Sequence, residues 1–310
     1  MKTKSSSIQI SRSPSKNRLA LVALFGGAVA IAFAPIFVRL SPVGPSATAF
    51  WRMILALPPL WIWAAFRKKE ERLRSPLPFS IPLFIGLAGV FFAGDLSLWH
   101  WSIKWTSIAN ATLLINFAPV FVTLGEWFFF QQKVKMAFIL SLGLALFGMT
   151  LIAWKSLQIN VITFGGDALS FAAALFYAGY LLSIKILRGH FSTPRLMAWT
   201  VPITGLTLLP ITLLSGESLF VRAPQGWAVL IGLALISQVA GQSLIAFALA
   251  HLPASFSSIA LLVQPVSAAL LAWLLLNEPI GFLQAIGGIL VLVGILAAKR
   301  GSLLEGEEKI

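Results

Sequence analysis

The sequence contains no cysteine, only three histidines and only ten acidic residues among 310. Without cysteine, the chain can form no disulfide, no thiolate metal site and no cysteine nucleophile. No two histidines occur at helical spacing and no two aspartates share a segment, so the sequence lacks the paired groups typical of intramembrane enzymes. We therefore expect no enzyme, no metal site and no cofactor.

Charged residues are also scarce, at 11%, whereas 58% of the residues are hydrophobic. Soluble domains are about half apolar and about one quarter charged, and the mean hydropathy of this chain is +0.90. Apolar runs of about 20 residues, long enough for a helix to cross a bilayer, recur along the chain. The ten runs cover residues 19–38, 45–66, 79–100, 106–129, 135–154, 165–186, 195–214, 226–249, 254–275 and 280–298. We expect an all-α polytopic membrane protein with ten transmembrane helices, because helices satisfy every backbone polar group within lipid.

Long loops are missing as well. The longest connections, near residues 67–80 and 158–165, leave no room for a folded soluble domain. The sequence therefore excludes an ATPase module and an extracellular receptor domain.

The chain repeats itself around two prolines that fall inside apolar runs. Residues 117–153 align without a gap with residues 263–299, so that Pro119 matches Pro265. A duplicated hydrophobic unit is how many secondary transporters are built. Five helices per unit is an odd number, which predicts two inverted five-helix repeats. The expected divisions are a basic N-terminal tail (1–18), a first repeat (19–155), a second repeat (162–298) and a C-terminal tail (299–310).

Basic residues gather on one side of this expected topology. Of the 23 Lys and Arg residues, eighteen fall in tails and loops on the same side as the N-terminus, four fall on the other side, and Arg52 lies within a helix. This is the positive-inside pattern, so we expect cytoplasmic termini in a plasma membrane, which in a bacterium is the inner membrane. Topology then accounts for the net charge of +13, and we expect no nucleic-acid partner.

The two repeated prolines, Pro119 and Pro265, occupy equivalent positions in the two inverted halves. A proline inside a helix removes a backbone donor and leaves a carbonyl without its partner about one turn earlier. Matching interruptions in inverted repeats point to a transport site, so both prolines are hinge or gate candidates. A simple packing kink is the alternative.

Only two charged residues, Arg52 and Asp95, lie well inside the apolar runs. A charge in the hydrocarbon region costs about 2.5–3.5 kcal/mol on insertion scales, so it needs a reason to remain there. Both residues fall roughly 10 Å below the same membrane surface at ~1.5 Å per residue. Three interpretations stay open: an ion pair that holds two helices together, binding of a substrate or proton, and snorkelling to the interface. Asp95 also matches Gln242 across the repeat, with one residue of slippage.

Uncharged polar residues follow one face of the fourth expected helix and recur in the second half. Thr112, Asn116 and Thr123 share this face, with Glu126 slightly offset. In lipid, such a face must line a cavity or form interhelical hydrogen bonds. We expect Glu126 and Glu278, at helix ends, to cap helices or pair with cations. The candidates for substrate binding or cavity lining are Arg52, Asp95, Thr112, Asn116, Ser170, Tyr177, Gln238, Gln242 and Gln264.

Small residues cluster in the last helix of each half, among them Gly143, Gly148, Gly287 and Gly294. They permit close helix approach, either within the protein or between two copies. A homodimer through these helices is therefore a hypothesis.

The motif around Pro265 carries a family resemblance. It comprises Gln264, Pro265 and Val266, then Leu275, Leu276, Asn277, Glu278 and Pro279, then Gly287, Gly288 and Gly294. The first half departs from it, with Phe130, Gln131, Gln132 and Lys133 where the family usually has a turn with a glutamate. With its two inverted halves, the chain resembles the EamA family of the drug/metabolite transporter superfamily over about residues 19–298. The resemblance implies alternating access around a central cavity, often with export of amino acids, other metabolites or drugs.

We therefore expect a secondary transporter, an exporter of a small organic metabolite such as an amino acid or a drug-like compound, embedded in a lipid bilayer. The expected mechanism is rocking of the third, fourth, eighth and ninth helices about the proline kinks. Proton coupling through Asp95, facilitated diffusion and exchange are all compatible with the sequence. The alternatives are a non-transporting membrane scaffold or subunit and, less favoured, an intramembrane enzyme.

Overall fold

The computed structural model describes residues 14–66, 80–132, 134–154, 163–276 and 279–307, and the regular structure within these residues is helical. Ten helical spans in this part of the chain are long and apolar enough to cross a membrane. They are Asn17–Leu40, Pro45–Phe66, Ile81–Trp105, Asn110–Phe130, Met136–Ala153, Phe164–Leu187, Thr193–Leu214, Pro224–Leu249, Ala254–Leu271 and Phe282–Arg300, numbered here as spans 1 to 10. The predicted all-helical membrane fold is confirmed.

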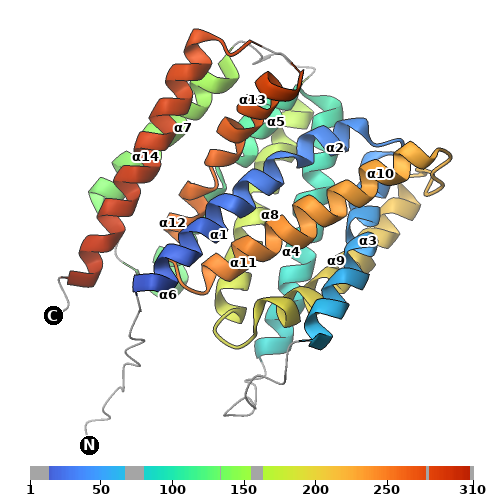
Figure 1. Cartoon of the computed structure of the whole chain (residues 1–310), viewed down its shortest axis with the longest axis horizontal. Helices are drawn as coiled ribbons and strands as arrows, with labels where there is room; N and C mark the ends of the chain where they lie inside the picture. The colour runs from blue at the N-terminus through green and yellow to red at the C-terminus, as the bar shows by residue number, and fades with distance from the viewer. Residues whose placement is uncertain (1–13, 67–79, 133, 155–162, 277–278, 308–310) are drawn as a thin grey trace, which may run out of the picture.

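Several spans consist of more than one helix, and the individual helices are labelled in Figure 1. Their bounds are α1 (Pro14–Ala32), α2 (Ala34–Leu40), α3 (Pro45–Phe66), α4 (Ser80–Trp105), α5 (Ile108–Ile115), α6 (Ala118–Phe130), α7 (Met136–Ala153), α8 (Phe164–Leu187), α9 (Thr193–Leu214), α10 (Pro224–Gly232), η2 (Leu233–Gln242), α11 (Ser243–Leu249), α12 (Ala254–Ala260), α13 (Val263–Leu276) and α14 (Phe282–Glu307). The first span begins and the tenth span ends at the same end of the bundle (Figure 1). We call this end the termini face and the opposite end, where α2 meets α3, the far face.

Three spans are interrupted just before a proline. Span 1 breaks between α1 and α2, before Pro35; span 4 breaks between α5 and α6, before Pro119; and span 9 breaks between α12 and α13, before Pro265. At each site the proline lacks the N–H that would continue the helix, and its ring clashes with the preceding turn. The structure therefore shows the two interruptions expected from the repeat and a third, in span 1, that was not predicted.

Span 8 is irregular in a different way. Its middle, η2, is a π-helix of ten residues, whereas the equivalent span of the first half, α4, is continuous. In a π-helix each backbone hydrogen bond spans five residues instead of four, so the side chains that follow point in directions different from those of an α-helix. Such segments are frequent at functional sites. Gln238 and Gln242 both belong to this segment.

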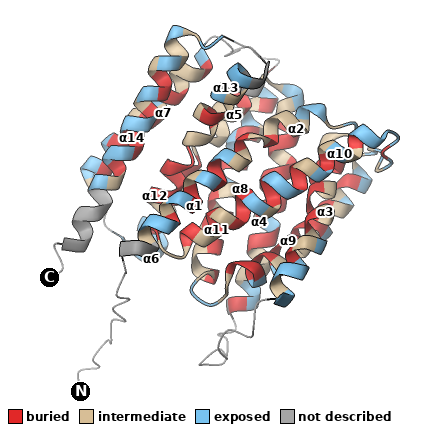
Figure 2. Ribbon diagram, in the orientation of Figure 1, coloured by how far each residue is buried: buried red, intermediate tan, exposed pale blue. Residues whose placement is uncertain are grey.

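Buried residues lie mainly in the interior of the bundle (Figure 2), and many of the exposed residues are large and apolar. The exposed side chains include Leu140, Phe147 and Leu296, each more than half exposed. Such a surface is stable in hydrocarbon, where a leucine gains nothing by leaving lipid for protein. The burial pattern therefore agrees with a membrane-embedded chain.

The small residues of α7 and α14 meet within one chain. A Cβ added to Gly148 would lie 2.6 Å from the Gly287 carbonyl oxygen, and one added to Gly294 would lie 2.8 Å from the Ser141 carbonyl oxygen. The two helices run side by side at one edge of the bundle (Figure 1). Glycine is thus required for this intramolecular contact, and the homodimer through these helices stays a prediction.

This close contact predicts a position-specific loss of stability. Gly148→Val should destabilise the protein by about 2–3 kcal/mol, because its side chain would overlap the backbone of α14. Gly143→Val is the matched control on the same helix, since a Cβ there has no neighbour within 4 Å. Thermal unfolding of the purified protein in detergent measures both. Equal melting temperatures for the two variants would contradict the intramolecular packing.

Candidate functional site

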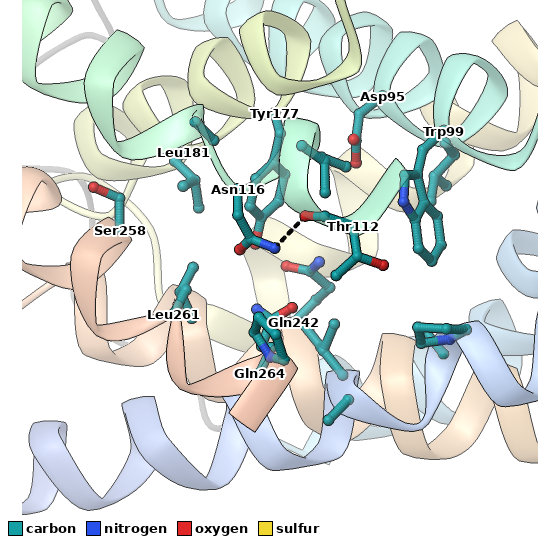
Figure 3. A pocket seen from close by; sticks show the side chains of 18 of the residues that line it. Asp95, Trp99, Thr112, Asn116, Tyr177, Leu181, Gln242, Ser258, Leu261 and Gln264 are labelled. Carbon is teal, nitrogen blue, oxygen red and sulfur yellow. Dashed lines mark hydrogen bonds between the residues drawn. The ribbon is translucent and has the colours of Figure 1, made fainter. Parts of the chain in front are cut away.

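A cavity of about 150 Å³ lies where the three interrupted spans converge (Figure 3). Pro35, Pro119 and Pro265 all line it, so each helix break faces the same space. The remaining lining residues are Ile31, Ala32, Ala34, Arg52, Phe92, Asp95, Leu96, Trp99, Thr112, Ile115, Asn116, Ala118, Tyr177, Leu181, Gln242, Ser258, Leu261, Gln264 and Ala268. The wall combines apolar surface with a few polar groups, as is usual for small-molecule sites.

The break in span 4 shapes one wall of the cavity. The Asn116 side chain donates from Nδ2 to the Thr112 carbonyl oxygen at 2.6 Å, and the Asn116 backbone N–H reaches the same oxygen at 3.3 Å. Asn116 therefore satisfies a carbonyl in the last turn before the interruption. Its side chain gathers with Tyr177, Gln242 and Gln264 in the middle of the cavity (Figure 3).

Arg52 is 2% exposed and is held by two groups other than Asp95. Its Nε donates to Gln238 Oε1 at 3.1 Å, and its Cζ lies 5.6 Å from the centre of the Phe92 ring, within cation–π range. Arg52 and Asp95 form no salt bridge with each other, because no guanidinium nitrogen of Arg52 comes within 4.0 Å of the Asp95 carboxylate. The direct Arg52–Asp95 ion pair is thus not formed in this conformation.

Asp95 is 5% exposed, and its Oδ1 has no hydrogen-bond partner within the described protein. The same holds for Nε1 of Trp99 and Oε1 of Gln242, which line the same cavity. Buried polar groups are normally paired, and an unpaired one costs about 1–3 kcal/mol. One unpaired donor and two unpaired acceptors around one cavity are what a ligand with complementary groups would satisfy.

Most of the candidates predicted from the sequence are brought together in this cavity. Nine of the eleven line it: Arg52, Asp95, Thr112, Asn116, Pro119, Tyr177, Gln242, Gln264 and Pro265. Gln238 lies behind the wall and holds Arg52. Ser170, predicted as a cavity-lining candidate, does not line the cavity. It is fully buried, and its hydroxyl donates to the Ala111 carbonyl oxygen at 2.5 Å, a bond that connects α8 to α5.

The lining residues that were not predicted as site residues are mostly apolar, but they include Pro35, Trp99 and Ser258. The internal repeat carried a usable signal for Ser258, because it lies 146 residues after Thr112. Asp95 and Gln242, which match across the repeat with one residue of slippage, both line the cavity. Pro35 has no such counterpart, because the first span of the second half, α8, is unbroken.

Glu126 joins the two interrupted spans at the termini face. Its two carboxylate oxygens accept hydrogen bonds from the backbone N–H groups of Ala254 and Ser255, each at 2.9 Å, and the residue is 3% exposed. The expectation that Glu126 caps a helix is therefore met, and the helix is α12, from the other half of the chain. The residue at the repeat-equivalent position is Ala272, so the sequence repeat does not carry this glutamate into the second half. Glu278 lies outside the described residues.

A second carboxylate caps a helix at the far face. Glu217 Oε2 accepts from the Ala47 backbone N–H at 2.9 Å, at the start of α3. This bond also connects the two halves of the chain. A third carboxylate between the halves, that of Asp167 on α8, accepts from Asn110 Nδ2 at 3.0 Å at the start of span 4. Of these three carboxylates, Glu126 is the one that joins spans 4 and 9 to each other.

Comparison with known proteins gives one family match that spans almost the whole chain. The model of the EamA-like transporter family matches residues 18–154 and again residues 164–298. An uncharacterized transporter of Archaeoglobus fulgidus is 27% identical over 84% of this chain and 90% of its own length. The uncharacterized transporter YyaM of Bacillus subtilis is 25% identical over 82% and 84% of the two chains.

Two further relationships extend this picture. The pseudopaline exporter CntI of Pseudomonas aeruginosa is 22% identical over 71% of this chain and 75% of its own length. A chain of known crystal structure superimposes with a TM-score of 0.74 at 16% identity, covering 94% of this chain and 98% of that chain. At this identity the superposition supports the fold alone.

Proposed function

Because the chain belongs to the EamA-like transporter family, we propose that it is a secondary carrier that exports a small organic metabolite by alternating access. The membrane is proposed to be the plasma membrane, the inner membrane in a bacterium, with both termini in the cytoplasm. The positive-inside distribution of Lys and Arg supports this orientation. In this orientation the termini face is cytoplasmic.

One observation carries the proposal: the broken helices of both inverted halves meet at one cavity that contains unpaired polar groups. Interrupted helices near the repeat interface are where secondary transporters place their substrate. A packed scaffold would gain nothing from leaving Asp95 Oδ1 and Gln242 Oε1 without hydrogen-bond partners inside the membrane.

The cavity chemistry supports a small substrate of mixed charge, such as an amino acid. Arg52 supplies a cation for a carboxylate, Asp95 supplies an acceptor for an ammonium group, and Phe92 and Leu181 offer apolar wall. A substrate with several phosphate groups is a poorer match, because Arg52 is the only cation among the lining residues described. Export is the direction named for one relative, CntI.

The proposed cycle rocks spans 3, 4, 8 and 9 about their irregular segments. Spans 4 and 9 bend at Pro119 and Pro265, and η2 in span 8 supplies a further deformable element. The Glu126 hydrogen bonds connect spans 4 and 9 at the termini face, which supports a state closed on this side. Opening toward the cytoplasm requires both Glu126 hydrogen bonds to break.

Water access to the cavity tests this function against the scaffold alternative. The chain has no native cysteine, so Asn116→Cys carries a single thiol. We expect a membrane-impermeant maleimide to label it, because Asn116 lines the cavity, and we expect transported substrate to slow the labelling. Ser170→Cys is the control, since Ser170 is fully buried between helices. If both thiols are equally protected from the maleimide under all conditions, the region around Asn116 is packed and the result supports the scaffold interpretation.

A further inference from the structure

A second cavity, of about 820 Å³, opens at the termini face. It lies among the start of α1, the end of α3, the turn from α8 to α9, and the segment from η2 to α11. Its lining residues are Leu19, Ala23, Trp63, Arg188, Gly189, His190, Phe191, Ser192, Thr193, Pro194, Val239, Ala240, Ser243, Leu244, Phe247 and His251. None of these residues lines the central cavity, so the two spaces are separate.

One side of this groove is polar and favours an anion. Arg188 is fixed there, with Nε donating to the Ala246 carbonyl oxygen at 3.0 Å and Nη1 donating to the Phe191 carbonyl oxygen. The positive end of α9, a helix of 22 residues, also faces the groove, and its N-cap residue Ser192 makes no side-chain capping bond. No carboxylate occurs among the described lining residues.

Ser243 provides an independent indication of a ligand. It is 5% exposed, and its hydroxyl has no partner within the described protein. Several buried helical serines bond the carbonyl four residues earlier, as Ser141 and Ser183 do, whereas Ser97 is unpartnered like Ser243 but does not line this groove. Ser243 directly follows the π-helix η2, where the backbone register differs from that of an α-helix. Its hydroxyl is therefore a donor at the wall of the groove without an internal acceptor.

The other side of the groove is apolar. Leu19 and Ala23 of α1 face Leu244 and Phe247 of α11, and Trp63 stands at the rim with 36% of its surface exposed. Tryptophan is enriched where the bilayer meets water, which is the level at which these spans begin and end. A ligand that fills this groove therefore needs an anionic head and a hydrocarbon tail.

We propose that this groove binds an anionic phospholipid from the leaflet at the termini face. The phosphate lies beside Arg188, the start of α9 and the Ser243 hydroxyl, and an acyl chain lies between α1 and α11. The groove is formed partly by span 8, which also supplies Gln242 to the central cavity, so the bound lipid contacts an element that must move during transport. The binding itself does not depend on what the protein transports.

Lipid retention measured by native mass spectrometry tests the proposal. Purified protein is mixed in detergent with equal amounts of phosphatidylglycerol and phosphatidylcholine, and we expect at least tenfold preferential retention of phosphatidylglycerol. Ser243→Ala combined with Arg188→Gln should reduce that preference about tenfold, because both side chains placed beside the phosphate are removed. Ser183→Ala is the matched control, because its hydroxyl is already bonded to the Gly179 carbonyl oxygen and lies outside the groove.

The comparison of the two lipids on the native protein needs no variant, so a misfolded double variant would leave the test intact. Equal retention of the two lipids by the native protein, or an unchanged preference in a folded double variant, would overturn the proposal. Thermal unfolding with inorganic phosphate separates the two sources of a phosphate group. Stabilisation by phosphate alone, with none from phosphatidylglycerol, would assign the groove to a soluble anion and reject the lipid.

Discussion

Arg52→Ala is expected to reduce transport about a hundredfold while leaving the protein folded in the membrane. The substitution removes the one cation found among the described residues of the central cavity and leaves Gln238 Oε1 without its donor. Truncating one member of a buried, hydrogen-bonded charged site typically costs 2–5 kcal/mol, and about 2.7 kcal/mol corresponds to a hundredfold. Initial rates of substrate flux in proteoliposomes measure the effect.

Arg52→Lys separates charge from geometry at this site. Lysine keeps a positive charge but has no Nε–H to offer Gln238 and no planar group to stack on Phe92, so an intermediate rate is expected. Thermal unfolding and gel filtration of each variant distinguish lost function from lost folding. A folded Arg52→Ala protein that transports at more than half the native rate would remove Arg52 from the site.

Glu126→Ala is expected to open the termini face. Two charge-assisted hydrogen bonds to the start of α12 disappear, and bonds of this kind contribute about 1.5–3 kcal/mol each. A loss of about 3 kcal/mol changes a two-state ratio about 150-fold, enough to make a rare inward-open state common. A cysteine at Asn116 should then be labelled from the termini side much faster than in the native background.

Glu217→Ala is the matched control for this gate. Glu217 also bonds the N-terminus of a helix from the other half, but at the far face and on α3. Its removal should leave labelling from the termini side unchanged. If both variants raise that labelling equally, general loosening of the bundle explains the result; if neither does, Glu126 is only a structural cap.

The sequence predicts the membrane fold well because lipid restricts the alternatives so strongly. Apolar runs of spanning length must be helices, and the ten predicted runs match the ten spans to within a few residues at most ends. The repeat identified Pro119 and Pro265, and both lie at interruptions that face the cavity. A proline inside a helix always removes a backbone hydrogen bond and clashes with the preceding turn, so the interruption it causes can be predicted from the sequence.

The remaining features depend on packing that sequence patterns do not record. Ser170 has a polar side chain on a helix face, but whether its hydroxyl meets a cavity or the Ala111 carbonyl depends on how close α5 lies. An Arg52–Asp95 ion pair was one of three interpretations, based on their common depth, whereas the group that Arg52 bonds is the amide of Gln238 on the π-helix. The depth of a residue in the membrane follows from its position along the helix. The direction in which its side chain points around the bundle does not, and the π-helix changes that direction further.

Flux through the purified protein in proteoliposomes tests the central claim most directly. The experiment supplies a panel of labelled metabolites, led by amino acids, with and without an imposed pH gradient, and uses Arg52→Ala as the inactive comparison. The account predicts saturable flux of at least one compound through the native protein, whether the compound accumulates with the gradient, as proton coupling requires, or only equilibrates, as in a facilitator or exchanger. Flux that never exceeds that of protein-free vesicles, for any compound and in either condition, would contradict the claim that this protein is a carrier.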